Sequence, residues 1–386
     1  MDDLDRIAGL HAAERPPSPA TTAAARARLL AEARPAVRRP GPMAPRTRVA
    51  VAAFLAAAVV ATAWGLYAWR TRPLYGVEPL AGQSGPAARF LLAAADGRAR
   101  NPSDGEVWYR RSTVGGTVLV TSPYRPGVRY AMEVEQDDYT LTVAHGTLPR
   151  RRFSHAATSR GWQGRRIDVR PATPVDRTIW KADLRPDAAT LGVNAPERAI
   201  GPEMGNGPVL DFGDEDARKL PADPAKLRAW LLNYATQFDH QRLPDPDRYL
   251  FGSASFLLVD APVSDAVRIA TYRVLASLKG VQAITATDAA GRISKGVAMR
   301  ETTPENGTVE LQLLVDARTG RLTASQTVII TPGSRNAGLR PGSRWFYEIV
   351  RQAEWTRTPP EKLLPKPDEE DDNVERGMVE ISPPSE

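Results

Sequence analysis

The stretch VAVAAFLAAAVVATAWGLYAW, residues 49–69, divides this chain into a short N-terminal part and a long C-terminal part. It contains no charged side chain. A helix of this length extends roughly 32 Å, close to the roughly 30 Å hydrocarbon core of a bilayer, and it satisfies its own backbone hydrogen bonds in lipid. We therefore predict a single transmembrane helix, whose characteristic residues are Val49, Phe54, Val60, Trp64, Tyr67 and Trp69.

Basic residues before this stretch predict its orientation, because positive residues favour the cytoplasmic side of a membrane. They are Arg38, Arg39, Arg46 and Arg48. We expect residues 1–48 in the cytoplasm and the long C-terminal part outside the cell membrane. The alternative is a cleaved signal peptide, since Ala61-Thr62-Ala63 resembles a processing site. The long leader and the apolar residues beyond that site favour an anchor.

The composition excludes several classes of function. The chain has 386 residues and no cysteine, so disulfides, thiolate catalysis and cysteine metal sites are absent. Its net charge of +6 comes from the arginines around the predicted span and a mildly basic C-terminal part, balanced by an acidic tail. No Lys/Arg cluster belongs to a recognisable nucleic-acid-binding module. We therefore expect no nucleic-acid partner.

The leader, residues 1–48, has two short segments of helical pattern, residues 3–13 and 23–33, followed by a proline-rich linker. Two short helices before a linker and a membrane span are typical of a small docking module. A leader that only sets the membrane topology is the other interpretation. The residues alone do not decide between the two.

Residues 70–185 predict a membrane-proximal helix followed by antiparallel strands. PAARFLLAAA (86–95) has the pattern of a short helix, and apolar and polar residues alternate from residue 106 to 146. Gly115-Gly116, Pro126-Gly127 and Asp137-Asp138 predict turns that divide this region into four strands. Two further strands are predicted near 164–169 and 177–180, and residues 186–222 are expected to form a loop.

Residues 223–356 predict two helices and a β-meander. Asp223 and Pro224 begin one helix, and Ser264 or Asp265 begins another that ends at Gly280. Asn306-Gly307 predicts a tight hairpin, and residues 344–355 a last strand. The fold class is therefore α+β, a transmembrane helix followed by an extracytoplasmic antiparallel sheet with a few helices. Whether 101–185 and 223–356 form one sheet or two domains stays open. The acidic tail, 357–386, is expected to be disordered.

The chain lacks a recognisable catalytic constellation. Its four histidines, at 11, 145, 155 and 240, do not have the spacing of a metal site. Ser253 and Ser255 lack the flanking pattern of a nucleophile elbow, and no phosphate-binding glycine loop is present. The acidic runs 214–216 and 368–372 are typical of solvated surface. We expect no catalytic residue, no cofactor and no metal.

Several motifs resemble those of an actinobacterial family of single-pass membrane proteins of uncharacterised function. They are A-R-A-R-L-L (25–30), Y-R-x-L-A-x-L-x-G-V (272–281), D-A-x-G-R (288–292) and D-x-R-T-G-R-L (316–322). The resemblance implies a companion of an extracytoplasmic-function sigma factor, and hence a sigma factor or other regulator bound through residues 1–33. The leader departs from zinc-type anti-sigma domains, because the H-x-x-x-C-x-x-C signature is missing.

Residues 86–143 are also similar to the periplasmic lipoprotein-carrier fold, on the segment YRPGVRYAMEVEQDDYTLTV (124–143) that follows a short helix. That likeness implies a curved sheet around an apolar cavity and a lipid or lipoprotein ligand. Two main hypotheses result. The first is a non-enzymatic membrane protein that couples an envelope signal to a cytoplasmic partner. The second is a membrane-tethered domain that binds lipid or lipoprotein. A cell-wall enzyme is the third, and it requires an acidic residue beside His240 or His145.

Overall fold

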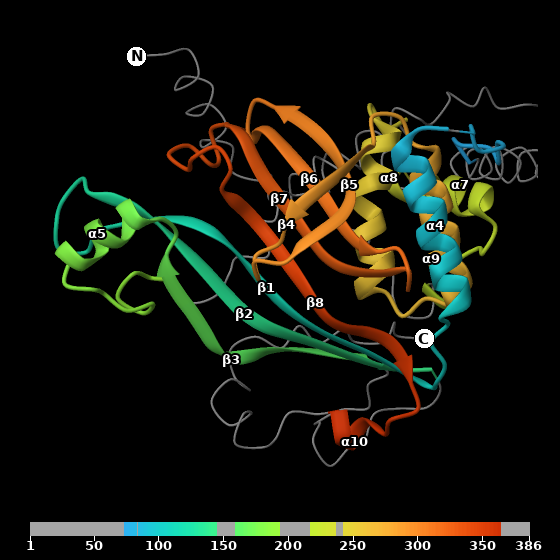
Figure 1. Ribbon diagram of the computed structural model, residues 1–386, viewed down its shortest axis with the longest axis horizontal. Helices are drawn as coiled ribbons and strands as arrows, with labels where there is room; N and C mark the ends of the chain where they lie inside the picture. The colour runs from blue at the N-terminus through green and yellow to red at the C-terminus, as the bar shows by residue number, and fades with distance from the viewer. Residues whose placement is uncertain (1–72, 83, 145–158, 194–216, 237–241, 364–386) are drawn as a thin grey trace, which may run out of the picture. The chain divides into compact units, whose positions relative to one another are not determined.

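The computed structural model describes residues 73–82, 84–144, 159–193, 217–236 and 242–363 (Figure 1). All of them belong to a compact unit formed by residues 73–386. The predicted leader, the transmembrane helix with its flanking arginines, and residues 364–386 of the acidic tail lie outside the described residues. No described helix is both long and apolar enough to cross a membrane.

One antiparallel sheet of eight strands forms the framework, in the order β3-β2-β1-β8-β7-β6-β5-β4. The first three strands are β1 (Val107–Thr121), β2 (Arg129–Val143) and β3 (Ser159–Pro171). The others are β4 (Gln282–Thr287), β5 (Ile293–Thr303), β6 (Gly307–Asp316), β7 (Arg321–Pro332) and β8 (Arg344–Thr356). Because β1 pairs with β8, the two regions that the sequence left separate form one sheet. The predicted α+β class with an antiparallel sheet is confirmed.

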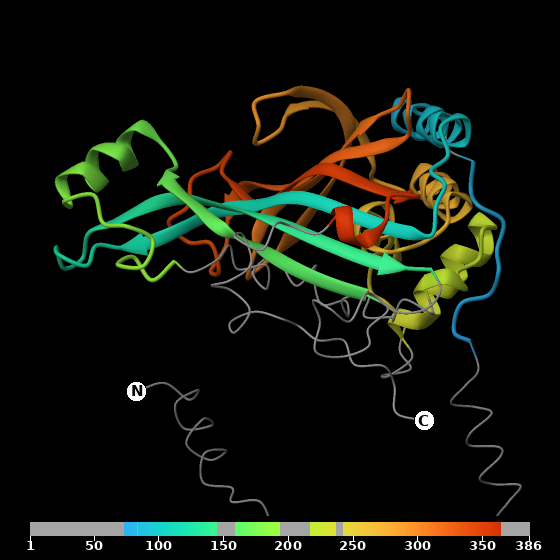
Figure 2. The same ribbon diagram turned by 90° about the horizontal axis from the view of Figure 1, so that it is seen from below.

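Most helices gather at one end of this sheet, and α5 lies at the other end (Figures 1 and 2). The first group comprises α4 (Pro86–Arg100), α7 (Pro224–Ala235), α8 (Pro246–Ser255), the π-helical turn η3 (Phe256–Asp260) and α9 (Asp265–Ser277). The remaining two are α5 (Pro174–Ala182) and α10 (Pro360–Leu363). Within the first group α4 packs along α9.

Local capping explains where these helices begin. The side chains of Asp223, Asp245 and Ser264 each accept a hydrogen bond from a backbone amide in the first turn of α7, α8 and α9. The predicted helices at 224 and 265 are therefore confirmed. No helix is predicted from the sequence over residues 246–260, and the structure forms one there. The cap at Asp245 and burial against α9 make this segment α8 and η3.

Two predicted turns are wrong, because Gly115-Gly116 and Asp137-Asp138 lie inside the long strands β1 and β2. The glycines allow close approach of strand β8 rather than a reversal of the chain. A Cβ at Gly115 would overlap the ring of Tyr347, and one at Gly116 would overlap the carbonyl oxygen of Trp345. The turn predicted at Pro126-Gly127 is confirmed, and Gly127 has a positive φ of 77°.

The strand predicted at 177–180 is also wrong, since these residues belong to α5. Thr173 caps this helix and Pro174 occupies its first position, which together favour a helix over a strand. The strand predicted at 164–169 is confirmed as part of β3, and the meander and the hairpin at Asn306-Gly307 are confirmed as β4–β8. Of the predicted loop 186–222, residues 194–216 lie outside the described residues.

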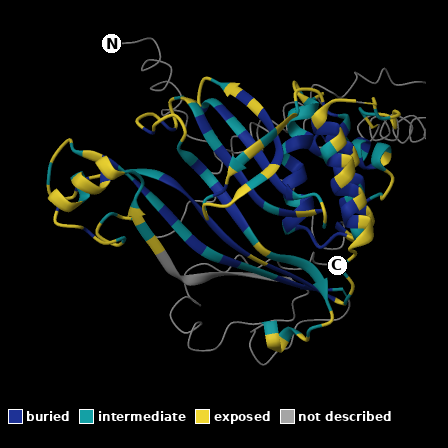
Figure 3. Ribbon diagram, viewed as in Figure 1, coloured by how far each residue is buried: buried dark blue, intermediate teal, exposed yellow. Residues whose placement is uncertain are grey.

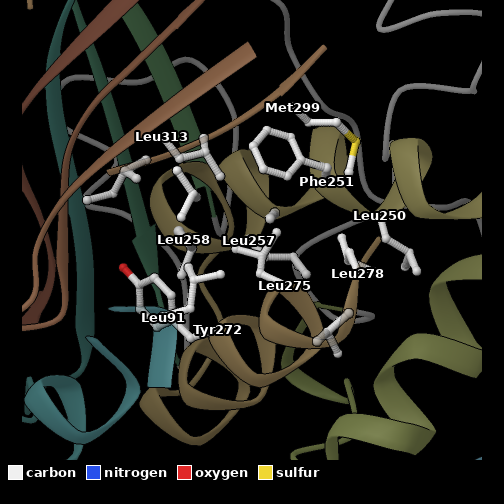
Figure 4. Close-up of a cluster of buried hydrophobic side chains, with 14 of the residues drawn as sticks. Leu91, Leu250, Phe251, Leu257, Leu258, Tyr272, Leu275, Leu278, Met299 and Leu313 are labelled. Atoms are coloured by element: carbon white, nitrogen blue, oxygen red, sulfur yellow. The ribbon is translucent and has the colours of Figure 1, made fainter. Parts of the chain in front are cut away.

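The core fills the space between the helices and the strands β5–β7 (Figure 4). The buried side chains that meet there include Leu91, Phe251, Leu257, Leu258, Tyr272, Leu275, Met299 and Leu313. Alternate residues of the strands point into it, as Val297, Met299 and Leu311 do, while their neighbours on the other face are mostly polar. This face of the sheet is thus covered by helices rather than open around a cavity.

Candidate functional site

Most residues that the sequence singled out lie outside the described part of the chain. This holds for the four histidines, both acidic runs, and the residues of the predicted span and its flanks. Within the described ranges, no group of three or more His, Asp or Glu side chains could hold a metal ion. Ser253 and Ser255 lie in α8, and the hydroxyl of Ser253 donates to the carbonyl oxygen of Tyr249 (2.8 Å). Ser253 is therefore bonded within its own helix.

Sequence reasoning missed a buried polar network centred on Arg110 in strand β1. Its guanidinium donates to Glu348 and to Asp138, each at 2.7 Å, and lies 3.1 Å from Asp260. The side chains of Arg110, Glu348 and Asp138 are at most 4 % exposed. Burial opposes the positive charge, but the three carboxylates outweigh it and raise the pKa of Arg110 above its usual value.

The network continues through Arg98 of α4 and Arg268 of α9, which share the carboxylate of Asp265. Arg268 stacks over the ring of Trp108 with 4.0 Å between the guanidinium carbon and the ring centroid, and it donates to the carbonyl oxygens of Ala261 (2.8 Å) and Val263. Burial lowers the pKa of Arg268 to about 9, with a further contribution from Arg98.

These arginines join the helix layer to the sheet. The indole of Trp108 donates to the backbone of Asp260 (3.2 Å), and that of Trp355 donates to Val263 (2.8 Å). Perturbed pKa values often mark functional sites, but buried ion-pair networks produce them as well. Apart from the Nε of Arg268, which has no hydrogen-bond partner among the described residues, most of the arginine donors are directed at protein carboxylates and carbonyls, so we assign the network a structural role. Alternation in β1 indicates that Trp108 and Arg110 share a face, but it does not reveal their distant partners.

The groove beside edge strand β4 is a better candidate for binding. It encloses about 470 Å³ and is bordered by the start of α4, the end of α9 and the first residues of β4. The side chains that form its apolar wall are Pro86, Ala87, Ala88, Leu275, Ala276, Leu278, Val281 and Ala283. Lys279 is the one charged residue among those lining it. We call this feature the α4–β4 groove, and its volume falls in the range of small-molecule sites.

A second hollow of about 430 Å³ also borders the connection between α9 and β4, but its lining has a different character. It is lined by charged residues, among them Asp245, Asp247, Arg300 and Glu310. Lys279 and Gln282 line both hollows. Of these two hollows, the α4–β4 groove is the one that combines an apolar wall with a single positive charge at its rim.

The outer edge of the sheet borders this groove. Strand β4 pairs with β5 and ends the strand order, so its other edge has no strand partner within the described residues. Its residues are exposed or half-buried throughout (Figure 3). An unpaired edge next to an apolar groove can accept an extended segment by backbone hydrogen bonds.

The structure is that of an α+β protein with one large antiparallel sheet and an apolar groove beside its edge strand β4. No protein-family model matches the chain, and no curated protein matches it. The similar solved structures include the crystal structure of a LolA superfamily protein from Nitrosomonas europaea. It shares 9 % sequence identity, covers 73 % of this chain and 99 % of that chain, and has a TM-score of 0.14. At this TM-score it assigns neither fold nor function.

Proposed function

We propose that this chain is a membrane-anchored binding protein rather than an enzyme. Its C-terminal unit, outside the cell membrane, takes an apolar ligand that carries a negative charge, such as a fatty acyl chain or an acylated peptide of a lipoprotein. The observation that carries this proposal is the α4–β4 groove. Its wall is apolar, and Lys279 is the one charge lining it.

The chemistry of the groove supports this ligand class over a polar one. Burial of an acyl chain contributes roughly 0.8 kcal/mol per methylene group, and the ammonium group of Lys279 can pair with a carboxylate or phosphate at the rim. Lys279 is exposed, so its charge is available there. The open edge of β4 adds backbone groups for the peptide part of an acylated segment.

Photocrosslinking tests this proposal in the full-length chain held in lipid nanodiscs, with a diazirine-bearing fatty acid as the probe. Mass spectrometry should map the crosslinks to residues 86–88 and 275–283. Ala283→Trp fills the groove and should abolish these crosslinks, whereas Thr285→Trp, two positions along the same exposed strand, should retain them. Lys279→Glu should weaken labelling by the acid but not by the matching fatty alcohol. Lys295→Glu, at another exposed lysine, is the charge control.

Crosslinks spread over the surface, or unchanged by Ala283→Trp, would refute a ligand site in the groove. A diazirine-bearing acylated peptide distinguishes the two sources of the acyl chain. Labelling by that peptide alone assigns a lipoprotein segment, and labelling by the free acid alone assigns a lipid.

A signalling role is the second proposal, supported by the apolar stretch 49–69, its flanking arginines and the motif order along the chain. In this proposal residues 1–33 hold a sigma factor at the cytoplasmic face. Affinity capture of the full-length protein from solubilised membranes should retain a sigma factor that is lost on deletion of residues 1–33. Capture of none by the full-length chain would reject the sigma factor as a partner.

A further inference from the structure

The far end of the sheet from the helix layer forms a separate surface feature, which we call the tip. It consists of the turn between β1 and β2 with the strand residues next to it, 121–130, and of α5 with its flanking residues, 172–193. Trp108 and Val120 mark the two ends of β1, about 40 Å apart at roughly 3.3 Å per residue. Figures 1 and 2 both show α5 at this end, away from α4, α8 and α9.

A buried carboxylate fixes α5 to the turn. Asp183, at the end of α5, accepts hydrogen bonds from Ser122, from Tyr130 (2.8 Å) and from Arg125 (3.1 Å). Burial opposes the ionisation of Asp183, but these hydrogen bonds outweigh it and lower its pKa below the usual value. At the other end of α5, Asp176 accepts from the backbone amide of Ala131 (3.0 Å). The tip is therefore rigidly attached.

This attachment holds an apolar side chain outward. Leu184 and Arg185 both adopt left-handed backbone conformations, with φ of 62° and 56°, which non-glycine residues rarely adopt in succession. The amide of Arg185 donates to Trp180 (3.0 Å), and the indole of Trp180 donates to the carbonyl oxygen of Pro186 (3.0 Å). In this conformation Leu184 is 80 % exposed.

Other apolar side chains of the tip are also exposed. Tyr124 in the turn and Val175 in the first turn of α5 are each 53 % exposed. Together with Leu184 they make up half of the six large apolar side chains that are most exposed in the described residues. Figure 3 shows α5 exposed over much of its length.

Basic residues occur in the same two segments as these apolar side chains. The tip contains five basic residues, Arg125, Arg129, Arg177, Lys181 and Arg185. Two of its three carboxylates, Asp176 and Asp183, are buried and hydrogen-bonded inside, which leaves Asp187 as the exposed one. Arg125 forms an ion pair with Asp183, and the five basic and three acidic residues give the tip a net formal charge of +2. Apolar side chains among Lys and Arg are typical of surfaces that enter the headgroup layer of an anionic membrane.

We propose that the tip docks on an anionic lipid bilayer, with Leu184 inserted among the acyl chains and the basic residues at the headgroups. This surface lies in a different part of the sheet from the α4–β4 groove and does not depend on a ligand there. An acidic protein surface could satisfy the charges, but it would not require an exposed leucine held out by a strained backbone.

The cysteine-free chain allows a direct test. Leu184→Cys carries the fluorophore NBD in the full-length protein, reconstituted in vesicles of phosphatidylcholine alone or with about 30 % phosphatidylglycerol. Ile293→Cys, at a position 77 % exposed at the start of β5, is the matched control. The probe at 184 should brighten, and be quenched by doxyl-labelled lipid, only in the anionic vesicles. Arg177→Gln and Lys181→Gln should each lower the docked-to-free ratio about five-fold, and the exposed Arg273→Gln should not.

Two outcomes would overturn the proposal. One is a probe at 184 that responds equally in neutral and anionic vesicles, or no more than the probe at 293. The other is a probe at 184 that responds to soluble polyglutamate but not to anionic vesicles, which assigns the tip to an acidic protein. A circular dichroism spectrum unchanged between variants and parent shows that the substitutions leave the fold intact.

Discussion

Replacement of Arg110 by leucine should destabilise the protein strongly, because it leaves buried carboxylates without their cation. Arg110 donates to Glu348 and Asp138 at 2.7 Å, and the side chains of all three are at most 4 % exposed. Removal of one partner from such a pair costs about 3–5 kcal/mol. The exposed pair of Arg300 and Glu310, whose arginine is 60 % exposed, should contribute less than about 1 kcal/mol.

Urea unfolding measures this difference, followed by tryptophan fluorescence and by far-ultraviolet circular dichroism. With a slope of about 2 kcal/mol per molar urea, Arg110→Leu should lower the unfolding midpoint by about 2 M. Arg300→Leu should change it little. Coincidence of the two optical signals shows that the transition is two-state, which the free energies require.

A double variant separates loss of the charge pair from loss of packing. Arg110→Leu combined with Glu348→Leu removes the cation and one of its carboxylates but leaves Asp138 buried, so it should recover only part of the lost stability, about 2 kcal/mol. If the double variant is no more stable than Arg110→Leu, the destabilisation does not come from the unpaired carboxylate of Glu348. If Arg110→Leu lowers the free energy of unfolding by less than about 1 kcal/mol, the charge network does not stabilise the junction between the helices and the sheet.

Three further predictions follow from individual residues. Asp183→Asn should destabilise α5 at pH 7. The difference in melting temperature between this variant and the parent should shrink as pH falls through the lowered folded-state pKa, because the stabilisation from ionised Asp183 is lost there. A difference that stays unchanged at acidic pH would contradict this. Burial raises the pKa of Glu301 in the folded protein. The carboxyl group of Glu301 therefore contributes its full stabilisation of the fold below its unfolded pKa of about 4.3, and this stabilisation declines as pH rises through the folded-state pKa. Glu301→Gln should therefore be more stable relative to the parent at pH 7 than at pH 4 by thermal unfolding. Gly115→Ala should cost about 1–3 kcal/mol in urea unfolding, because its Cβ would overlap Tyr347, whereas Gly76→Ala, with open space around it, should cost nothing measurable.

Local sequence signals predicted the elements that depend on neighbouring residues. The caps at Asp223 and Ser264 and the turn at Asn306-Gly307 act over three or four positions, so they are visible in the sequence. The same local reasoning failed at Gly115-Gly116. Glycine pairs are common in turns, and the strand that requires their small size lies more than two hundred residues further along the chain.

The candidate groove could not be predicted, because its wall comes from three separate segments. Residues 86–88, 275–278 and 281–283 are unremarkable in the sequence, and only the packing of α4 on α9 brings them together. The basic and apolar residues of the tip are visible in the sequence, but their exposure is not. Trp180 has the same apolar character as Leu184, yet it packs inward on Val120 and Tyr130.

The sequence by itself determined the α+β class, the antiparallel character of the sheet and the absence of cysteine chemistry. It also predicts an apolar anchor that lies outside the described residues. Tertiary structure alone decided that all eight strands join in one sheet, that Arg98 meets Asp265 and that Arg110 meets Glu348. These pairs lie 167 and 238 residues apart in the chain. The physical reason is that burial makes each charge depend on a partner, and the fold rather than the local sequence supplies that partner.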